Sequence, residues 1–497
     1  MNKQSAETSV YDFCIVGLGI GGLNALFVAT QYLPKGSSIL LIDKHPRVGG
    51  MWNESYDHVR LHQPHQMFTV GDLEWEWDRP PEYLATGVEV QAHLESCLRR
   101  LERDYSVTKL FEHSYESADE IGDLVKITAK DQSSNQTISL KAKKAILTLG
   151  WGIPQIKAKA VTSEHVISTS PVEFVKDDTD PSTPVYIIGG GKTGTDTAQF
   201  ILQKYPDRKV TLIDGVGNRF GDRDMLFPTG LGRFWRGKLV GKISADIIMR
   251  LDGKNFESVF DYFRSNYTVG LRDDGEQYFF SILSRAEAQF LNKNLNQIIP
   301  NYFDDVIDVH GSPVVSFRDG DKLPIKHGAI ILNSTGHLLR GDTSYQSFVS
   351  KGGRIARVNP RSSIYFLSTT SSYFLAHLLM QDKLRRLPLY EVDLTDLFKR
   401  DRKTFFLVSL TQSFLNMLTM MENVDMEVFG KCGVDLNRWY PMSRRLLSFA
   451  SLKMNQKRYM AHCREVLSIV EQELGIECRP LIESKKFQGL AEPLDAA

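Results

Sequence analysis

Two stretches of the chain show the same order of apolar and polar positions. Residues 13–16 form a short apolar run, glycine-rich residues 17–22 (GLGIGG) follow, and residues 23–32 are apolar over the length of a helix. Residues 185–188, the GGGKTG at 189–194 and the run to Leu202 repeat that order. Each stretch predicts a buried strand, a tight turn and the N-terminus of a helix.

An acidic residue follows each of these units at a similar spacing. Further strands are predicted at 39–42 and 210–213, and they end in Asp43 and Asp214, about twenty residues after the last glycine. The glycines permit the turn, the approach of a pyrophosphate to the backbone and close helix packing, and the acid can accept hydrogen bonds from a ribose diol. One such loop could be a glycine turn in an unrelated α/β domain. Two in register predict two dinucleotide sites.

The first predicted site comprises Gly17, Gly19, Gly22 and Asp43, with Lys44 beside it. The second comprises Gly189, Gly191, Lys192, Thr193, Gly194 and Asp214. The phosphates are expected at the two helix N-termini, where free N–H groups and the helix dipole favour an anion.

The remaining pattern predicts an α/β fold with two Rossmann-type domains and a helical C-terminal extension. Strands are expected at 125–129, 145–149, 329–332 and 364–367, and residues 157–184, rich in Ser, Thr, Asp and Pro, are linker-like. We therefore predict a discontinuous first domain, a second domain and an extension. Their expected ranges are 10–165 with 325–390, then 175–324, then 391–497.

Composition narrows the function classes. Lys plus Arg equals Asp plus Glu at 60 each, which disfavours nucleic acid or an anionic membrane as a partner. The apolar run at 404–421 is interrupted by polar residues, so a buried helix is expected there instead of a membrane span. The polar start of the chain shows no signal-peptide pattern, and the five scattered cysteines include no CxxC pair. A reducing, cytoplasmic location without a disulfide-reducing dithiol is expected.

Five motifs in order resemble the class B flavin-dependent monooxygenases, which include flavin-containing monooxygenases, amine N-hydroxylases and Baeyer-Villiger enzymes. They are GLGIGG with Asp43, GGMW at 49–52, LTLGWGIP at 147–154, GGGKTG, and NSTGH at 333–337. The resemblance implies FAD at the first loop, with Gly50 and Trp52 against the flavin, and NADPH at the second. Thr335 and Gly336 are further cofactor-binding candidates. It further implies that a C4a-hydroperoxide of the flavin transfers one atom of O2 to a small molecule.

Two segments indicate which branch of the family the chain resembles and which residues are candidates for catalysis. The linker lacks the Phe, Gly and His fingerprint of two branches, whereas SSYFLAHLLMQDKLRRL at 371–387 resembles the N-hydroxylases. N-hydroxylation of an amine is the leading expectation, with Baeyer-Villiger or sulfur oxygenation as alternatives. In the family the segment matching 61–68 lies over the flavin, so His62 and Gln63 are the catalytic candidates, or they satisfy loop backbone. Pro64 within the histidine cluster argues against a metal site.

Several alternatives stay open at this point. Asp214 favours the free ribose of NADH, whereas the resemblance implies NADPH, for which Arg219 or Arg223 could compensate. A reductase that does not oxygenate, or a catalytically silent sensing protein, would use the same loops. A homo-oligomer is possible. The aromatic insertion at 215–285 and the C-terminal helices are expected to shape the substrate pocket.

Overall fold

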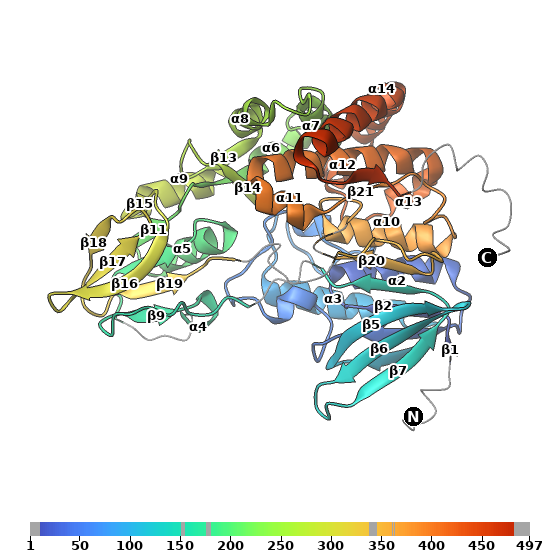
Figure 1. The fold of residues 1–497 in the computed structure, drawn as a ribbon, viewed down its shortest axis with the longest axis horizontal. Coiled ribbons are helices and arrows are strands. Elements are labelled where there is room, and N and C mark those ends of the chain that lie inside the picture. Colours follow the sequence, from blue (N-terminus) through green and yellow to red (C-terminus); the bar gives the residue numbers. More distant parts are fainter. Residues whose placement is uncertain are drawn as a thin grey trace.

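Two parallel sheets, each with a glycine-rich loop directly after one of its strands, lie at the left and the lower right in Figure 1, and a helical unit lies at the top. The computed structural model describes residues 10–150, 155–174, 180–336, 345–359, 361 and 363–481. Residues 151–154 and His337, which belong to two of the motifs, lie outside this part of the chain.

The first sheet has the strand order β20-β8-β2-β3-β4, and all neighbours are parallel. Its central strands β2 and β8 are buried along their whole length because both faces of the sheet are covered, as is usual for parallel sheets. Helices α2, α3 and α10 cover one face, and a small sheet of order β1-β7-β6-β5 covers the other. The strands are β2 (Phe13–Val16), β3 (Ser38–Ile42), β4 (Ser106–Leu110), β8 (Ala145–Thr148), β20 (Ile355–Val358), β1 (Val10–Tyr11), β5 (His113–Ile121), β6 (Leu124–Asp131) and β7 (Thr137–Ala142). The helices are α2 (Ile20–Tyr32), α3 (Gly87–Leu101) and α10 (Ser368–Met380), and the short helices η1 (Gly50–Asn53) and η2 (His65–Met67) lie in the loop between β3 and α3.

The second sheet repeats this plan with the order β15-β11-β10-β19-β9, again parallel throughout. Helices α5 and α9 pack on one face, and the antiparallel β16, β17 and β18 pack on the other. The strands are β9 (Ile167–Thr169), β10 (Val185–Ile188), β11 (Val210–Ile213), β15 (Gln297–Ile299), β19 (Ile330–Asn333), β16 (Phe303–Val309), β17 (Ser312–Phe317) and β18 (Lys322–Pro324). The helices are α4 (Pro171–Phe174), α5 (Lys192–Lys204) and α9 (Arg285–Asn294).

Two details of the predicted domains are wrong. Strand β19 pairs with β10, so the first domain does not resume at residue 325, and its fifth strand is β20. Residues 364–367 form bends because side chains take their backbone groups. Ser371 Oγ accepts from Tyr365 N at 3.0 Å and donates to Tyr365 O at 3.1 Å, and Ser413 Oγ accepts from Phe366 N at 2.8 Å. An apolar run of four residues does not encode which of two parallel sheets it joins.

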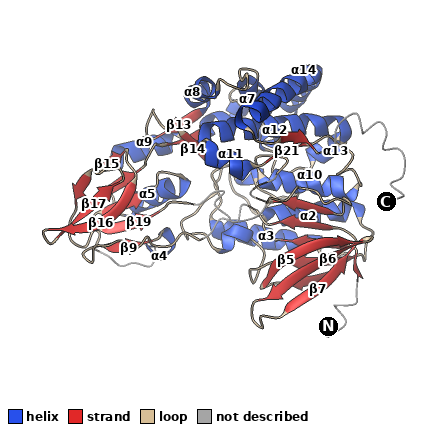
Figure 2. Ribbon diagram, in the orientation of Figure 1, coloured by secondary structure: helices blue, strands red, loops and turns tan. Residues whose placement is uncertain are grey.

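The aromatic insertion and the C-terminal extension form one helical unit. They share an apolar core that contains residues of α7, α8, α12 and α14. In Figure 2 these helices lie together at the top, above a three-stranded sheet of order β13-β12-β14. The elements from the insertion are β12 (Asn218–Asp222), α6 (Arg223–Leu226), η3 (Gly230–Phe234), α7 (Val240–Ile248), α8 (Phe256–Tyr267), β13 (Thr268–Gly270) and β14 (Gln277–Leu283). Those from the extension are β21 (Tyr390–Val392), α11 (Leu394–Arg400), α12 (Arg402–Asn423), α13 (Met426–Gly430), η4 (Leu436–Trp439), α14 (Met442–Leu474) and β22 (Cys478–Pro480).

Helix α12 is the one described helix that is long and apolar enough to cross a membrane by length and composition, and 94% of its most apolar window is buried in the protein. The prediction of a buried helix in this segment is confirmed. Its core position explains its composition, because a helix surrounded by other helices is apolar on all sides.

Candidate cofactor and substrate sites

The backbone of the first glycine-rich loop, residues 17–22, is largely uncovered by side chains. Gly17 has a φ of +87° and donates its N–H to Ile42 O at 2.8 Å, which ties the turn to β3. A Cβ on Gly22 would lie 1.9 Å from Gly17 O, so helix α2 can approach β2 this closely only with glycine there. Gly19 caps α2 without any side-chain hydrogen bond. The first N–H groups of α2 therefore face outward as an anion site.

Asp43 at the end of β3 is buried and anchors the same loop. Its Oδ2 accepts from Leu18 N at 2.5 Å, and its Oδ1 accepts from His45 N at 2.8 Å. Lys44 points elsewhere, because its Nζ lies 3.2 Å from Glu54 Oε1. The acid is thus held at the turn, where a ribose would lie beside the pyrophosphate.

Two further elements close around this loop. Gly50 in η1 has a φ of +55°, and a Cβ on it would lie 2.9 Å from Gly19 Cα. Trp52 in η1 packs edge-on against Phe68, with ring centroids 5.8 Å apart. On the other side α10 approaches α2, since a Cβ on Gly21 would meet Ser372 Oγ at 2.7 Å. The N-termini of α2 and α10 therefore lie close together.

The second loop has the same construction. Gly189 has a φ of +99° and donates to Ile213 O at 2.9 Å, and a Cβ on Gly194 would lie 1.9 Å from Gly189 O. Gly191 caps α5 without a side-chain hydrogen bond, and no protein atom lies within 4 Å of a Cβ built on it. This loop also leaves space at the helix N-terminus for an anion. Thr335 and Gly336 follow β19 beside it, and a Cβ on Gly189 would meet Thr335 Cγ2 at 3.2 Å.

Both arginines predicted for a 2′-phosphate have hydrogen-bond partners within the protein. Arg219 is buried, and its guanidinium donates to Thr268 Oγ1 at 2.9 Å and to Arg272 O at 2.5 Å. Arg223 donates from Nε to His62 O at 2.8 Å. Side chains alternate in direction along a strand, and in β12 this directs Arg219 toward the paired strand β13. The linear sequence does not reveal this pairing.

Arg272 lies beside the turn that follows Asp214. Its Nη1 donates to Gly215 O at 2.9 Å, in the turn directly after Asp214, and it also pairs with the exposed Asp274. Asp214 lies under the loop and accepts from Asn218 Nδ2 at 2.8 Å, and burial raises the pKa of its carboxyl. No motif spacing links Arg272 to Asp214. The sequence analysis therefore did not predict a role for Arg272.

Polar contacts join the first domain to the N-terminus of α5. Lys192 pairs with Asp196, and Asp196 Oδ2 accepts from Tyr56 OH at 3.2 Å. His58 stacks on Phe200 with ring centroids 4.4 Å apart and lies 3.2 Å from Thr197 Oγ1. Thr193 is a further hydrogen-bonding partner of the Tyr56 hydroxyl. These contacts fix the loop that carries His62 against the second domain.

His62 and Gln63 line a mostly apolar cavity of about 110 Å³ between this loop and the helical unit. Burial, followed by the charges of Lys192 and Arg223, lowers the pKa of His62 to about 3, so its imidazole is neutral at physiological pH. Among the described residues, Gln63 Oε1 and Arg223 Nη2 are buried polar atoms without a partner. Such atoms suit a cleft that receives a polar group of a ligand.

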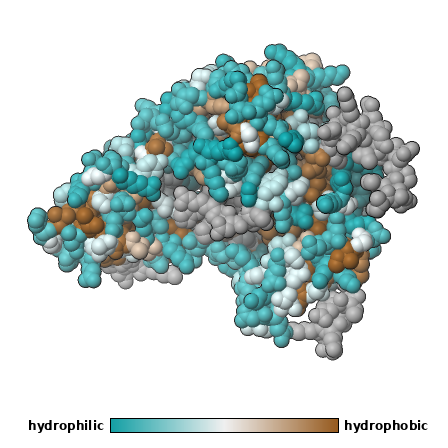
Figure 3. All heavy atoms as spheres, viewed as in Figure 1, coloured by the Kyte–Doolittle hydropathy of each residue, from teal (hydrophilic) through white to brown (hydrophobic). Residues whose placement is uncertain are grey.

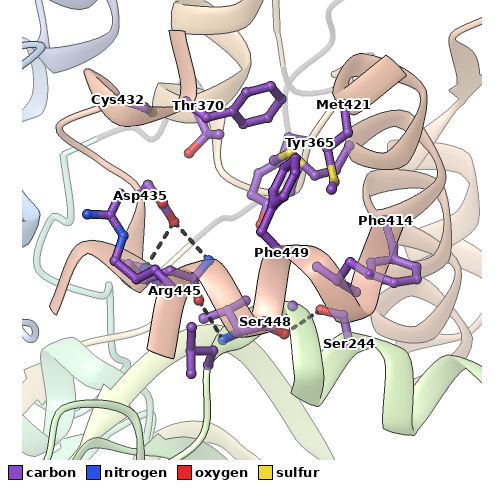
Figure 4. Close-up of a pocket in the computed structure, with 18 of the residues that line it drawn as sticks. Ser244, Tyr365, Thr370, Phe414, Met421, Cys432, Asp435, Arg445, Ser448 and Phe449 are labelled. Atoms are coloured by element: carbon purple, nitrogen blue, oxygen red, sulfur yellow. Dashed lines mark hydrogen bonds between the residues drawn. The ribbon is translucent and has the colours of Figure 1, made fainter. Parts of the chain in front are cut away.

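A larger cavity of about 290 Å³ lies inside the helical unit (Figure 4). Its wall combines α7, α12 and α14 with Leu367 and Thr370 at the N-terminus of α10, and Asp435 and Arg445 are its charged lining residues. The two cavities share part of their walls: Val240, Ser244, Phe366, Leu367, Leu410 and Leu436. The predicted contribution of the insertion and the C-terminal helices to a pocket is thus seen in the structure.

Comparisons with known proteins agree with this geometry. Residues 11–224 match the family model described as pyridine nucleotide-disulphide oxidoreductase. An uncharacterized protein of Mycobacterium tuberculosis and one of Mycobacterium bovis are each 29% identical over 104 residues, which are 19% of this chain. The chain spans 19% of the length of these curated relatives.

Solved structures show a related architecture at low identity. Cyclohexanone-bound cyclohexanone monooxygenase has 13% identity and a TM-score of 0.50, with 90% of this chain and 98% of that chain covered. The ornithine N-hydroxylase of Kutzneria sp. has 12% identity and a TM-score of 0.49, over 76% and 100%. Bacillithiol disulfide reductase from Bacillus cereus has 13% identity and a TM-score of 0.45, over 75% and 100%.

The matched family model thus covers most of the first sheet and part of the second, and cyclohexanone monooxygenase shares the overall fold of the chain. The predicted α/β fold with two Rossmann-type domains and a helical C-terminal region is confirmed.

Proposed function

We propose that the protein is a monooxygenase that uses FAD, NADPH and O2 to oxygenate an apolar small molecule. The balanced reaction consumes one NADPH, one proton, one O2 and one substrate. It yields NADP+, one water and a substrate that carries one added oxygen atom.

The two loops fit the two nucleotides. Gly17, Gly19 and Gly22 with Asp43 would hold the pyrophosphate and ribose of FAD, since a Cβ at Gly17 or Gly22 would collide with backbone and α2 has no side-chain cap. Gly189, Gly191 and Gly194 would do the same for NADPH, with Arg272 near its 2′-phosphate. Bound flavin supplies the transfer of two electrons from NADPH and the activation of O2.

The mostly apolar cavity inside the helical unit is the observation that carries the oxygenase proposal. It reaches Leu367 and Thr370 at the N-terminus of α10, and α10 contacts α2 beside the first loop. A water-poor chamber at this position protects an oxygenating flavin from wasteful collapse, which a simple reductase does not need. His62 and Gln63 line the adjoining cavity, toward the second loop.

An amine nitrogen is the proposed site of oxygenation. An apolar cavity favours the neutral form of an amine, and the neutral form is the nucleophile. The neutral imidazole of His62 adds no opposing charge, and the Gln63 amide can hold a polar group of substrate or nicotinamide. Carbonyl carbon and sulfur are the competing positions.

A disulfide reductase is the alternative that the cysteines disfavour. Cys14, Cys97, Cys432, Cys463 and Cys478 are all buried and unpaired, and burial raises the pKa of each thiol. A dithiol mechanism needs an accessible, easily ionised pair.

The test is a comparison of NADPH oxidation, O2 uptake and product mass for apolar amines, ketones and thioethers of equal size. We expect equal amounts of NADPH and O2 to be consumed and the amine to gain one oxygen atom. Ser244→Leu, which narrows both cavities, should slow turnover, while the matched surface change Ser182→Leu should not. NADPH oxidation that continues without O2, with an added electron acceptor and no oxygenated product, would instead identify a reductase.

A further inference from the structure

A continuous surface of exposed apolar and basic side chains lies on η3 and on the first half of α14. Trp235 is 67% exposed, Leu447 69% and Met454 81%. Phe234, Leu231, Met442 and Leu446 are exposed beside them. We propose that this docking surface, formed by residues 231–236 and 442–458, binds the face of an anionic lipid membrane.

The two segments are held together by one side chain. The Arg444 guanidinium in the first turn of α14 donates to Arg233 O at 3.1 Å and Gly237 O at 3.0 Å, and it also donates to Arg236 O. The residues after η3 are thus fixed to the start of α14. The exposed side chains of both segments therefore belong to one surface and move as a unit.

Helix α14 separates its residues by face over this length. Met442, Leu446, Ala450 and Met454 follow one another at intervals of four on its exposed side, whereas Ser448 and Gln456 are buried. Apolar patches appear along the upper edge of Figure 3, where α14 lies in Figure 1. Large apolar side chains gathered on a surface mark an interaction site.

The charge of the docking surface identifies its partner as anionic. Residues 231–236 and 442–458 contain no acidic residue, although the whole chain has equal numbers of acidic and basic residues. Their basic residues are Arg233, Arg236, Arg444, Arg445, Lys453, Lys457 and Arg458. Exposed apolar side chains flanked by Lys and Arg are the pattern of a helix that lies in the headgroup region of anionic lipid.

The large cavity opens at this surface. Met442 and Leu446 line the cavity and are 60% and 56% exposed, so they form its mouth. Arg445 and Phe449, one helical turn apart on α14, continue the wall inward (Figure 4). A molecule dissolved in the bilayer can therefore enter the cavity without crossing water. This delivery step rests on the proposed function, whereas docking does not.

The experiment is co-sedimentation of the FAD-loaded full-length protein with vesicles of phosphatidylcholine, with and without phosphatidylserine. We expect binding to the anionic vesicles that weakens with salt. Trp235→Ser with Leu447→Ser removes apolar contacts, and Lys453→Glu with Lys457→Glu reverses charge. Each pair should weaken binding by about tenfold or more.

Matched controls change equally exposed residues outside the docking surface. Val88 in α3 is 76% exposed and Lys126 in β6 is exposed, so Val88→Ser and Lys126→Glu should leave vesicle binding unchanged. Unchanged FAD content and melting temperature show that the variants fold. Equal weakening by the controls, or no binding of the wild type to anionic vesicles, would overturn the proposal.

Two other occupants give distinct results. If a second copy covers the surface, the wild type is a dimer in solution, the Trp235 and Leu447 variant is a monomer, and vesicles do not bind. If an acidic protein covers it, lipid binding is absent at all salt concentrations. Docking variants that lose vesicle binding but keep turnover of a detergent-dispersed substrate support lipid delivery. Turnover that is absent in every variant refutes the proposed function and leaves docking intact.

Discussion

Replacement of Gly191 by alanine tests the second loop without damage to the fold. Gly191 has φ −69° and ψ −175°, which any residue adopts, and a Cβ there meets no protein atom within 4 Å. The methyl group instead occupies the space in front of the α5 N-terminus, where a pyrophosphate must approach. We therefore expect normal FAD content and melting temperature, with weakened NADPH binding.

The size of the effect follows from the contacts that the methyl group prevents. A hydrogen bond from a backbone N–H to a charged phosphate contributes about 1.5–3 kcal/mol. Loss of one such bond raises the KM for NADPH by about 10- to 150-fold. By contrast, Gly194→Ala places a Cβ 1.9 Å from Gly189 O and should lower the melting temperature.

Steady-state kinetics with varied NADPH and titration with NADP+ measure this change. The matched variant Gly19→Ala, whose Cβ would lie at an ordinary 3.5 Å from Gly50 Cα, should lower FAD retention and leave NADP+ affinity unaltered in the FAD-loaded fraction. The reasoning is refuted if Gly191→Ala binds NADPH as the wild type does, or if it loses FAD instead.

Three further outcomes are expected. Arg272→Ala should raise the KM for NADPH by about tenfold and leave that for NADH unchanged, because the guanidinium lies at the turn after Asp214; a parallel rise for both coenzymes would contradict this role. Ser244→Leu should reduce turnover of the bulkiest substrates by about tenfold and spare small ones, as measured across a homologous series; a uniform loss would speak against a steric effect. Burial lowers the pKa of His93 to about 3 and that of His377 to about 4, against 6.5 when unfolded. The unfolded state therefore binds more protons below pH 6.5, and each histidine should cost about 2 kcal/mol of stability between pH 7 and pH 5. Chemical denaturation at both pH values checks this, and His93→Gln should reduce the loss.

The sequence predicts the local units of this fold well. The glycine spacing and the apolar runs locate β2, β3, β10 and β11 within a residue or two, because turn, strand and helix N-terminus are all encoded within thirty positions. The sheet that a later strand joins is not encoded locally, so the sequence pattern does not show that β19 pairs with β10.

The site residues can likewise be predicted only where the signal is local in the sequence. Asp43 and Asp214 follow from spacing, whereas Arg272 reaches the second loop through the pairing of β12 with β13. Arg219 is locally as plausible, but alternation along β12 buries it. The cavity depends on the joining of the insertion with the C-terminal helices, which their separate apolar faces do not specify.

The most direct test of the account is turnover of an apolar amine by the FAD-loaded protein with NADPH under isotopically labelled O2. We expect one labelled oxygen atom in the product for each NADPH oxidised, and no product without O2. Unlabelled or unaltered substrate, with NADPH oxidation supported by an artificial acceptor in the absence of O2, would contradict it.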